Sequence, residues 1–337
     1  MTGAPEQRTM DALSDVLRVA QLSGGVFLNA HFTAPWCMAA RISPEICAPF
    51  LGSSAHFIPY HYVVAGELRV ALQDQDPVLL CAGECVLFPR NDLHVMGSDL
   101  ALRASSIREI LAGCQGVGPH HIRHGGGGAV TRLICGYLGC ASARGNPVFA
   151  SLPPLMRISA SDGGSTDWFR AMFEFASSEL AVGQPGSDTV LAKLSEVLFV
   201  EAVRRHTQNL PAGGTGWLAG LRDQPVARAL ALMHGNISRN WDVDQLAGEV
   251  GLSRSALADR FVRVLGLAPM QYLAQWRMQV AAQSLKRAAL PLSRVAEQVG
   301  YESEAAFSRA FKKSFGASPG TWRRQNTEPD SGRREAD

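Results

Sequence analysis

Residues 241–273 read WDVDQLAGEVGLSRSALADRFVRVLGLAPMQYL, and residues 291–324 read PLSRVAEQVGYESEAAFSRAFKKSFGASPGTWRR. The two stretches repeat one pattern of apolar and turn residues with a period near fifty. After the central turn the offset is fifty, and the pairs are Leu257 with Phe307, Phe261 with Phe311, Gly266 with Gly316 and Pro269 with Pro319. Before the turn the offset is forty-nine, and the pairs are Ala247 with Ala296 and Gly251 with Gly300. One structural unit therefore occurs twice, with one extra residue in the second turn.

Each copy carries the stop and start signals of two short helices joined by a tight turn. Gly251 and Gly300 can end the first helix in the left-handed conformation that glycine adopts at low cost. Ser253 and Ser303 can then cap the second helix by accepting hydrogen bonds from its free N–H groups. Helix, glycine turn and capped helix form the helix-turn-helix pattern. A single copy would fit a plain helical hairpin equally well.

The repeat lies in a basic part of the chain. Residues 222–326 hold fifteen Lys and Arg against eight Asp and Glu, whereas the residues before them are weakly acidic. Asp242-x-x-Gln245 ahead of the first copy approximates a capping box, and a helix begun by Pro269 and running to about Arg287 joins the two copies. Two copies in a basic domain favour double-stranded DNA as the partner over a purely structural helical domain.

Helix phase predicts which side chains of each second helix face DNA. If Leu257 and Phe261 are buried in one helix and Phe307 and Phe311 in the other, the remaining positions point outward. The base-reading candidates are Arg254, Ser255, Ala258, Asp259, Glu304, Ala305, Ser308 and Arg309. The phosphate-contacting candidates, one to two turns further on, are Arg263, Lys312 and Lys313.

The chemistry of these side chains suggests individual roles. Arg309 can form a bidentate pair with guanine, while Asp259 or Glu304 can accept a hydrogen bond from N4 of cytosine. Ala258 and Ala305 offer only methyl contact, so base discrimination is expected to be narrow. For each charged residue the alternative is a solvated helix face.

Residues 222–325 closely resemble the AraC/XylS family of bacterial transcription regulators, and GYESEAAFSRAFKKSFGASPGTWRR is a very specific match. The resemblance implies two helix-turn-helix units held by the linking helix. It also implies that both recognition helices enter successive major grooves on one face of the DNA.

The first two hundred residues are organised differently. Between about 25 and 140, short β-rich runs separated by turn residues predict an antiparallel sandwich or barrel. The stretch PHHIRHGGGG at 119–128 is expected to be a loop, because four consecutive glycines do not fit a strand or helix interior. Helical periodicity follows over 165–207, broken at 183–188.

These boundaries predict two domains. The first covers 1–208, a Pro/Gly-rich linker covers 209–221, and the helix-turn-helix domain covers 222–326. Residues 327–337 are expected to form a disordered tail.

A second resemblance concerns Gly83, Pro89, Asn91 and His94, which follow the spacing of the second cupin motif, with Asn91 where that family usually has glycine. The first cupin motif is degraded, because His61 stands without a second histidine. A metal needs three or four ligands, so we expect no metal or other cofactor, although His120, His121 and His124 could add ligands. His61 and His94 remain candidates for an effector pocket.

Longer stretches, such as GGGGAVTRLICGYLGC followed by SLPPLM, resemble the cupin-type sensor domain attached to one branch of AraC-like regulators. That resemblance implies a small-molecule or signal pocket inside the barrel and a homodimer formed through the helices at 165–207. A redox signal is the alternative, with Cys81, Cys85, Cys135 and Cys140 as candidates. Against it, buried cysteines usually serve as small apolar side chains.

The expected fold class is α+β with two domains: an N-terminal antiparallel cupin-like β-barrel with helices, and a C-terminal all-α domain with two helix-turn-helix units. The chain of 337 residues has no apolar run long enough to span a membrane, no secretory h-region and seven cysteines, which predicts a reducing cytoplasm. The leading hypothesis is a DNA-binding transcription regulator, not an enzyme, with RNA polymerase as a further candidate partner. The alternative is a metal-dependent cupin enzyme with an accessory helical domain.

Overall fold

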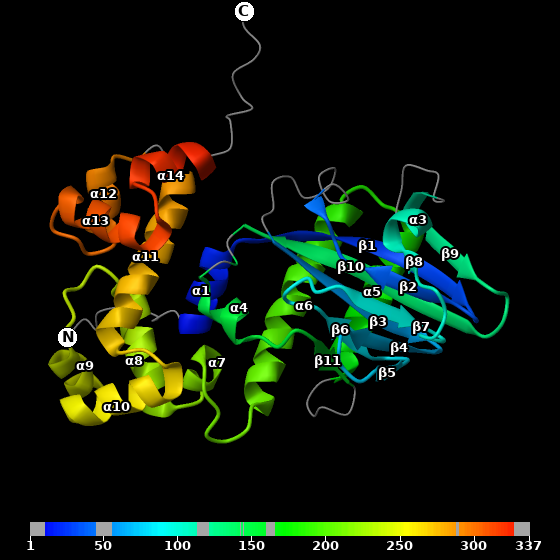
Figure 1. Cartoon of the computed structure of the whole chain (residues 1–337), viewed down its shortest axis with the longest axis horizontal. Helices are drawn as coiled ribbons and strands as arrows, with labels where there is room; N and C mark the ends of the chain where they lie inside the picture. The colour runs from blue at the N-terminus through cyan, green and yellow to red at the C-terminus, as the bar shows by residue number, and fades with distance from the viewer. Residues whose placement is uncertain are drawn as a thin grey trace, which may run out of the picture. The chain divides into compact units, whose positions relative to one another are not determined.

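The computed structural model describes residues 11–44, 56–112, 121–141, 143, 145–159, 166–287 and 290–326. The predicted tail at 327–337 lies outside the described residues. Contacts between Cα atoms divide the chain into two compact units (Figure 1). The sheet unit comprises 20–144 and 152–208, and the helical unit comprises 1–19, 145–151 and 209–337, each as far as it is described.

The sheet unit is built from two sheets. The strands of the six-stranded sheet, in spatial order, are β11 (Met156–Ile158), β6 (Cys85–Leu87), β3 (His56–Ala65), β10 (Val130–Cys140), β1 (Leu22–Thr33) and β9 (His121–Gly125). Those of the five-stranded sheet are β5 (Val78–Cys81), β4 (Glu67–Leu72), β7 (His94–Gly97), β2 (Cys37–Ala40) and β8 (Ser105–Ser106). Helix α3 (Ile107–Ala112) follows β8. The short β-rich runs predicted as strands are therefore confirmed.

The β-barrel is realised as a sandwich. Among the described residues the two sheets share no strand, so hydrogen bonds do not close a single barrel. The pairing is also not wholly antiparallel, because β9 runs parallel to β1 and β8 parallel to β2. Apolar side chains from both sheets, including Phe32, Trp36, Leu68 and Phe88, form one core. The burial of these side chains, rather than closure by hydrogen bonds, holds the two sheets together.

The prediction of a loop over 119–128 is partly wrong. Residues 119 and 120 lie outside the described residues, and residues 121–125 form β9, which pairs in register with Asn29–Thr33 of β1. The residues after Gly125 form a loop, as predicted. Gly125 permits this pairing, since a Cβ there would lie 1.9 Å from the backbone oxygen of Thr33. The glycine run does not exclude a strand, because glycine at its start lets two backbones approach closely.

The helical periodicity over 165–207 is confirmed by two helices, which cover the outer face of the larger sheet. They are α5 (Thr166–Val182) and α6 (Ser187–Asn209). Phe173 of α5 stacks on Tyr62 of β3 with ring centroids 3.9 Å apart. Ser195 of α6 lies 3.1 Å from the Tyr60 hydroxyl, measured between the two oxygens.

The helical unit contains both helix-turn-helix motifs. Its helices are α1 (Ala12–Ala20, of which Ala20 is counted with the sheet unit), α4 (Pro147–Ser151), α7 (Trp217–Gly220), α8 (Gln224–Gly235), α9 (Val243–Val250), α10 (Arg254–Leu265), α11 (Pro269–Arg287), α12 (Leu292–Gln298), α13 (Glu304–Phe315) and α14 (Pro319–Asn326). The predicted caps are confirmed: the side chains of Asp242, Ser253 and Ser303 each accept a backbone N–H bond at a helix start. Gly251 ends α9 in the left-handed conformation with φ 72°.

The helical unit includes two segments that precede the predicted linker in the sequence. Helices α1 and α4, which flank the β-rich sequence, belong to the helical unit (Figure 1). Asn146, just before α4, donates a side-chain hydrogen bond to the Val16 carbonyl at 3.1 Å. Within the predicted linker, residues 217–220 form the buried helix α7. The division into 1–208, 209–221 and 222–326 remains a prediction about folding units.

Candidate functional site

The recognition helices α10 and α13 expose the faces that helix phase assigns to DNA. Leu257, Phe261, Phe307 and Phe311 are fully buried. Six base-reading candidates are exposed, namely Arg254, Ser255, Asp259, Glu304, Ala305 and Arg309, while Ala258 and Ser308 are half-buried. The phosphate candidates Arg263, Lys312 and Lys313 are exposed as well.

The exposed faces of α10 and α13 differ in chemistry, although the two helices occupy equivalent positions in the repeat. In the fifty-residue register, Arg254 corresponds to Glu304 and Asp259 to Arg309, so the charge is reversed at both positions. Val262, one helical turn after Asp259 on α10, is not among the predicted candidates and is 47% exposed. An exposed valine on a recognition helix can contact the methyl group of thymine. The two helices can therefore recognise different base sequences.

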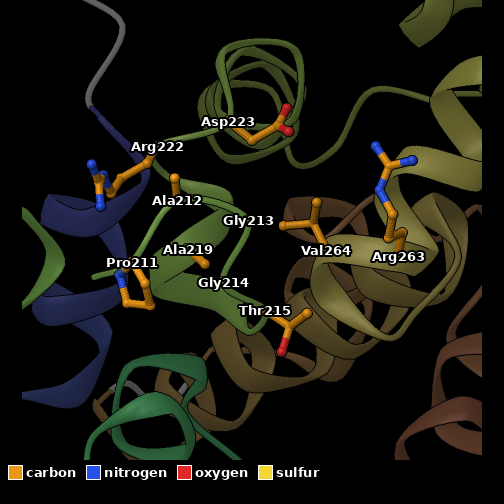
Figure 2. Close-up of a pocket in the computed structure, with 10 residues that line it drawn as sticks. All are labelled: Pro211, Ala212, Gly213, Gly214, Thr215, Ala219, Arg222, Asp223, Arg263 and Val264. Atoms are coloured by element: carbon orange, nitrogen blue, oxygen red, sulfur yellow. The ribbon is translucent and has the colours of Figure 1, made fainter.

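Neighbouring groups orient some of these side chains. The Arg254 guanidinium donates to the Asp244 carboxylate of α9 at 3.1 Å, and both side chains are exposed. Arg263 lies at the rim of a cavity of about 330 Å³ lined by Pro211–Thr215 and the end of α10. Figure 2 shows the guanidinium groups of Arg222 and Arg263 extending away from Gly213 and Gly214. The two guanidinium groups are therefore not positioned to bind one anion inside this cavity. Arg263 remains exposed to solvent.

An ion pair that the sequence analysis missed fixes α10. Asp223 caps the N-terminus of α8 by accepting the Val226 N–H bond, and its two carboxylate oxygens lie 2.9 and 2.8 Å from Nε of Arg260. One carboxylate thus joins the start of α8 to the middle of the first recognition helix. The residues are 37 positions apart, which is beyond any local pattern.

A second arginine joins the two halves of the helical unit. Arg277 of α11 donates to the backbone oxygens of Ile237 and Arg239 at 3.0 and 2.8 Å, and to that of Gly300 at 3.4 Å. Gly300 is the turn residue of the second helix-turn-helix. The linking helix therefore holds that turn against the loop before α9.

A buried hydrogen-bonded chain lies beneath the first motif. Nδ1 of His234 is 2.9 Å from the Asp15 carboxylate, and its Nε2 is 2.7 Å from the Tyr272 hydroxyl. Trp217 donates to the same hydroxyl at 2.8 Å. All groups are satisfied when His234 carries its proton on Nδ1 and Tyr272 donates to Nε2. Burial raises the pKa of Asp15, but the hydrogen bonds from His234 and Arg18 lower it by more than burial raises it. The pKa of Asp15 is therefore below its ordinary value.

In the sheet unit, the two candidate effector residues meet. The Nε2 atoms of His61 and His94 are 3.0 Å apart, and His94 stacks on Phe88 with ring centroids 3.7 Å apart. Burial lowers the pKa of His94 to about 4, and burial together with His94 holds the pKa of His61 well below its usual range. Both rings are neutral at neutral pH. His94 donates from Nδ1 to the Asp92 carbonyl at 3.1 Å, so its Nε2 accepts from His61.

The surroundings of this pair do not form a metal site or an open pocket. The described residues contain no group of three or more His, Cys, Asp or Glu that could hold a metal ion, so the donor set does not fit a cupin metal centre. His120 lies outside the described residues. His61 lines a cavity of about 30 Å³, the space of about one water molecule.

The structure does not bring the four candidate redox cysteines together. Cys85 is level with Tyr62 and Cys135 with His61, and adjacent residues of β3 face opposite sides, so these thiols lie on opposite faces of the sheet. Cys140 is five residues beyond Cys135 on β10. Burial raises the pKa of Cys135 to about 12 and that of Cys85 well above its ordinary value. Of the four, only Cys81 is exposed.

Helices α5 and α6 each expose a strip of apolar side chains to solvent. The members recur at seven-residue intervals and are Trp168, Phe175 and Val182 on α5, and Val190 and Val197 on α6. Helical spacing also gives α6 a second apolar strip, made of Leu191, Leu194, Leu198 and Val203, and this strip is packed within the sheet unit. Leu191, Leu198 and Val203 are buried, and Leu194 is half-buried. In the described part of the chain, no helix is long and apolar enough to cross a membrane.

Comparison with known proteins relates both units to known families. Residues 11–208 match the family model described as cupin, and residues 246–325 match that of a helix-turn-helix domain. A putative AraC-like transcription regulator of Streptomyces antibioticus is 30% identical over 94% of this chain and 99% of its own length. The HTH-type transcriptional regulator AlkR of Acinetobacter baylyi is 29% identical over 94% of this chain and 100% of its own.

A third relative is the RCS-specific HTH-type transcriptional activator RclR of Escherichia coli, which is 26% identical over 93% of this chain and 97% of its own length. Among solved structures, an AraC-type transcriptional regulator from Chromobacterium violaceum is 29% identical, covering 33% of this chain and 98% of that chain, with a TM-score of 0.31.

Proposed function

The chain belongs to the AraC-like family of DNA-binding transcription regulators with a cupin sensor domain, and we propose that α10 and α13 read its DNA site. One observation carries this assignment. Two capped recognition helices, fifty residues apart in sequence, present exposed faces of unlike chemistry in a basic unit.

The proposed division of labour follows from side-chain chemistry. Arg309 pairs with guanine, and Asp259 or Glu304 accepts from cytosine. Arg263 of the first motif and Lys313 of the second contact DNA phosphates. Because the equivalent positions carry opposite charges, we expect a recognition site whose two halves differ in sequence.

The sheet unit is the proposed receiver of the signal. We favour a small molecule over an oxidant, because Cys85 and Cys135 are buried thiols on opposite sheet faces with raised pKa values, which disfavours the reactive thiolate. Entry of a molecule beside His61 and His94 would require the sheets to open, since the cavity there holds about one water. Such an opening would couple ligand binding to a change in the sandwich.

We further propose that the protein acts as a non-enzymatic homodimer in the cytoplasm, where it would meet DNA and RNA polymerase. The exposed strips on α5 and α6, which include Phe175 and Val197, supply apolar surface of the kind that a second copy covers. Two linked copies would raise the effective concentration of the second DNA-binding unit at adjacent sites. The metal-dependent enzyme is not favoured, because the described residues offer His61 and His94 without a third ligand.

Genome-wide mapping of bound sites, with and without candidate signals, tests this function. We expect a small number of sites that share a two-part motif, with occupancy that changes when the signal is present. Binding that is spread evenly over the genome and ignores sequence would contradict the assignment of α10 and α13 as base readers.

A further inference from the structure

A cavity of about 410 Å³ lies within the helical unit, away from the recognition faces. Its walls come from four places in the sequence: the segment around α4, the start of α7, the turn between α10 and α11, and α11 itself. Pockets of this size hold small organic molecules. The exposed residues Ala150 and Gln275 stand at its edge, where a ligand would enter.

The described lining is apolar and aromatic, and it carries no charged side chain. The larger apolar members are Pro147, Trp217, Leu265, Leu267, Tyr272 and Trp276. The polar members are Ser151, Gln275 and Gln279. Because an ion would have no counter-charge there, this lining selects an uncharged molecule with a large apolar body.

The hydrogen-bond donors around this lining are engaged or closed off. Trp217 donates to Tyr272 at 2.8 Å, and the Ser151 hydroxyl donates to the Pro147 carbonyl at 2.9 Å. Nε1 of Trp276 has no partner among the described residues, but it is buried, so an acceptor in the cavity does not reach it. The lining therefore holds a ligand mainly through apolar contact.

We propose that this cavity is a ligand site for an uncharged, largely apolar molecule, which its aromatic and aliphatic walls hold by contact. The site is distinct from the sensor interior, where the cavity beside His61 is about 30 Å³. A molecule bound here would contact Leu265 and Leu267, which end the first recognition helix and begin the turn to α11. It would thereby act on the DNA-binding unit directly.

The test uses full-length protein and the uncharged naphthalene ketone prodan, whose fluorescence reports an apolar site. We expect saturable binding of about one prodan per chain, with energy transfer from tryptophan, because Trp217 and Trp276 line the cavity. Ala150→Trp fills the entrance and should weaken binding at least roughly tenfold.

A matched control separates this cavity from general apolar surface. Ala274 is an exposed alanine of the same helix that does not line the cavity, so Ala274→Trp should leave the affinity for prodan unchanged. Gln275→Trp is a second entrance variant, to be used if Ala150→Trp does not fold. The proposal is overturned if prodan does not bind saturably, or if a folded entrance variant binds it as tightly as the parent.

Discussion

The imidazole of His234 lies 2.9 Å from the carboxylate of Asp15, measured from Nδ1 to Oδ2, although the two residues are 219 positions apart. Both side chains are buried, and the contact joins α1 to α8. The helix that precedes the β-rich sequence is therefore part of the core of the helical unit.

Replacing Asp15 should destabilise the helical unit. Asp15→Ala leaves the Nδ1–H of His234 buried without an acceptor, which costs about 1–3 kcal/mol in the free energy of unfolding. Asp15→Asn retains an acceptor oxygen and should cost less than Asp15→Ala. Chemical denaturation of the two variants and the parent measures the difference. Equal stability of Asp15→Ala and the parent would show that the contact contributes nothing.

Arg309→Ala should relax base preference at one or two positions of the DNA site. The expected cost on the best site is roughly 1–3 kcal/mol, the range of a bidentate contact to guanine. Lys313→Ala serves as the control, because loss of a phosphate contact weakens all sequences alike. In vitro binding-site selection with each variant is the measurement. An unchanged motif for Arg309→Ala would mean that Arg309 contacts the backbone or only solvent.

Binding to DNA should fall steeply as salt rises, because phosphate neutralisation releases counterions. Each of Arg263, Lys312 and Lys313, when changed to alanine, should reduce the slope of log K against log salt by about 0.9. Lys193→Ala, on α6 of the sheet unit, should leave the slope unchanged. Titrations at several salt concentrations decide this, and a parent slope near zero on specific DNA would overturn the phosphate assignments.

Charges placed on the exposed strips of α5 and α6 should break the dimer. Phe175→Glu combined with Val197→Glu puts two carboxylates on an apolar contact surface while both side chains point to solvent in the single chain. Leu93→Glu is the matched control, since Leu93 is 51% exposed elsewhere in the sheet unit. Light scattering should report half the mass only for the first variant. A folded double variant with the parent mass would exclude these strips as the interface.

The sheet unit should lose stability as pH falls from about 6.5 towards about 4, because protonation of His94 is favoured in the unfolded state. Burial lowers the pKa of His94 to about 4 in the folded chain, so the unfolded chain binds more protons in this window. The contribution of His94 is present in full above about pH 6.5 and amounts to about 3 kcal/mol.

Denaturant titrations of the parent and His94→Gln at pH values across this window measure that contribution. The difference in unfolding free energy between the two proteins should shrink as the pH falls. A difference that stays constant with pH would mean that His94 titrates normally in the folded state.

Local rules were sufficient for the helix-turn-helix motifs. The positions of Ser253, Ser303, Gly251 and Gly300 predicted where the helices start and end, because caps and turns depend on neighbours within about one helical turn. The phase of Phe307 and Phe311 likewise predicted the outward faces. In the N-terminal part, short β-rich runs between turn residues predicted most strands. Strand β9 was not predicted, because its pairing depends on the backbone of β1, which is distant in sequence.

The sequence alone thus determined the repeat, the two-domain α+β class and the identity of the residues that face outward on α10 and α13. Only the tertiary structure decided which apolar strip of α6 is covered, that His61 and His94 share a hydrogen bond, and that Asp15 meets His234. Each of these depends on contacts between residues far apart in the chain. Periodicity and capping depend on interactions between residues close together in the chain. The burial and pairing of distant side chains depend instead on how the whole unit packs.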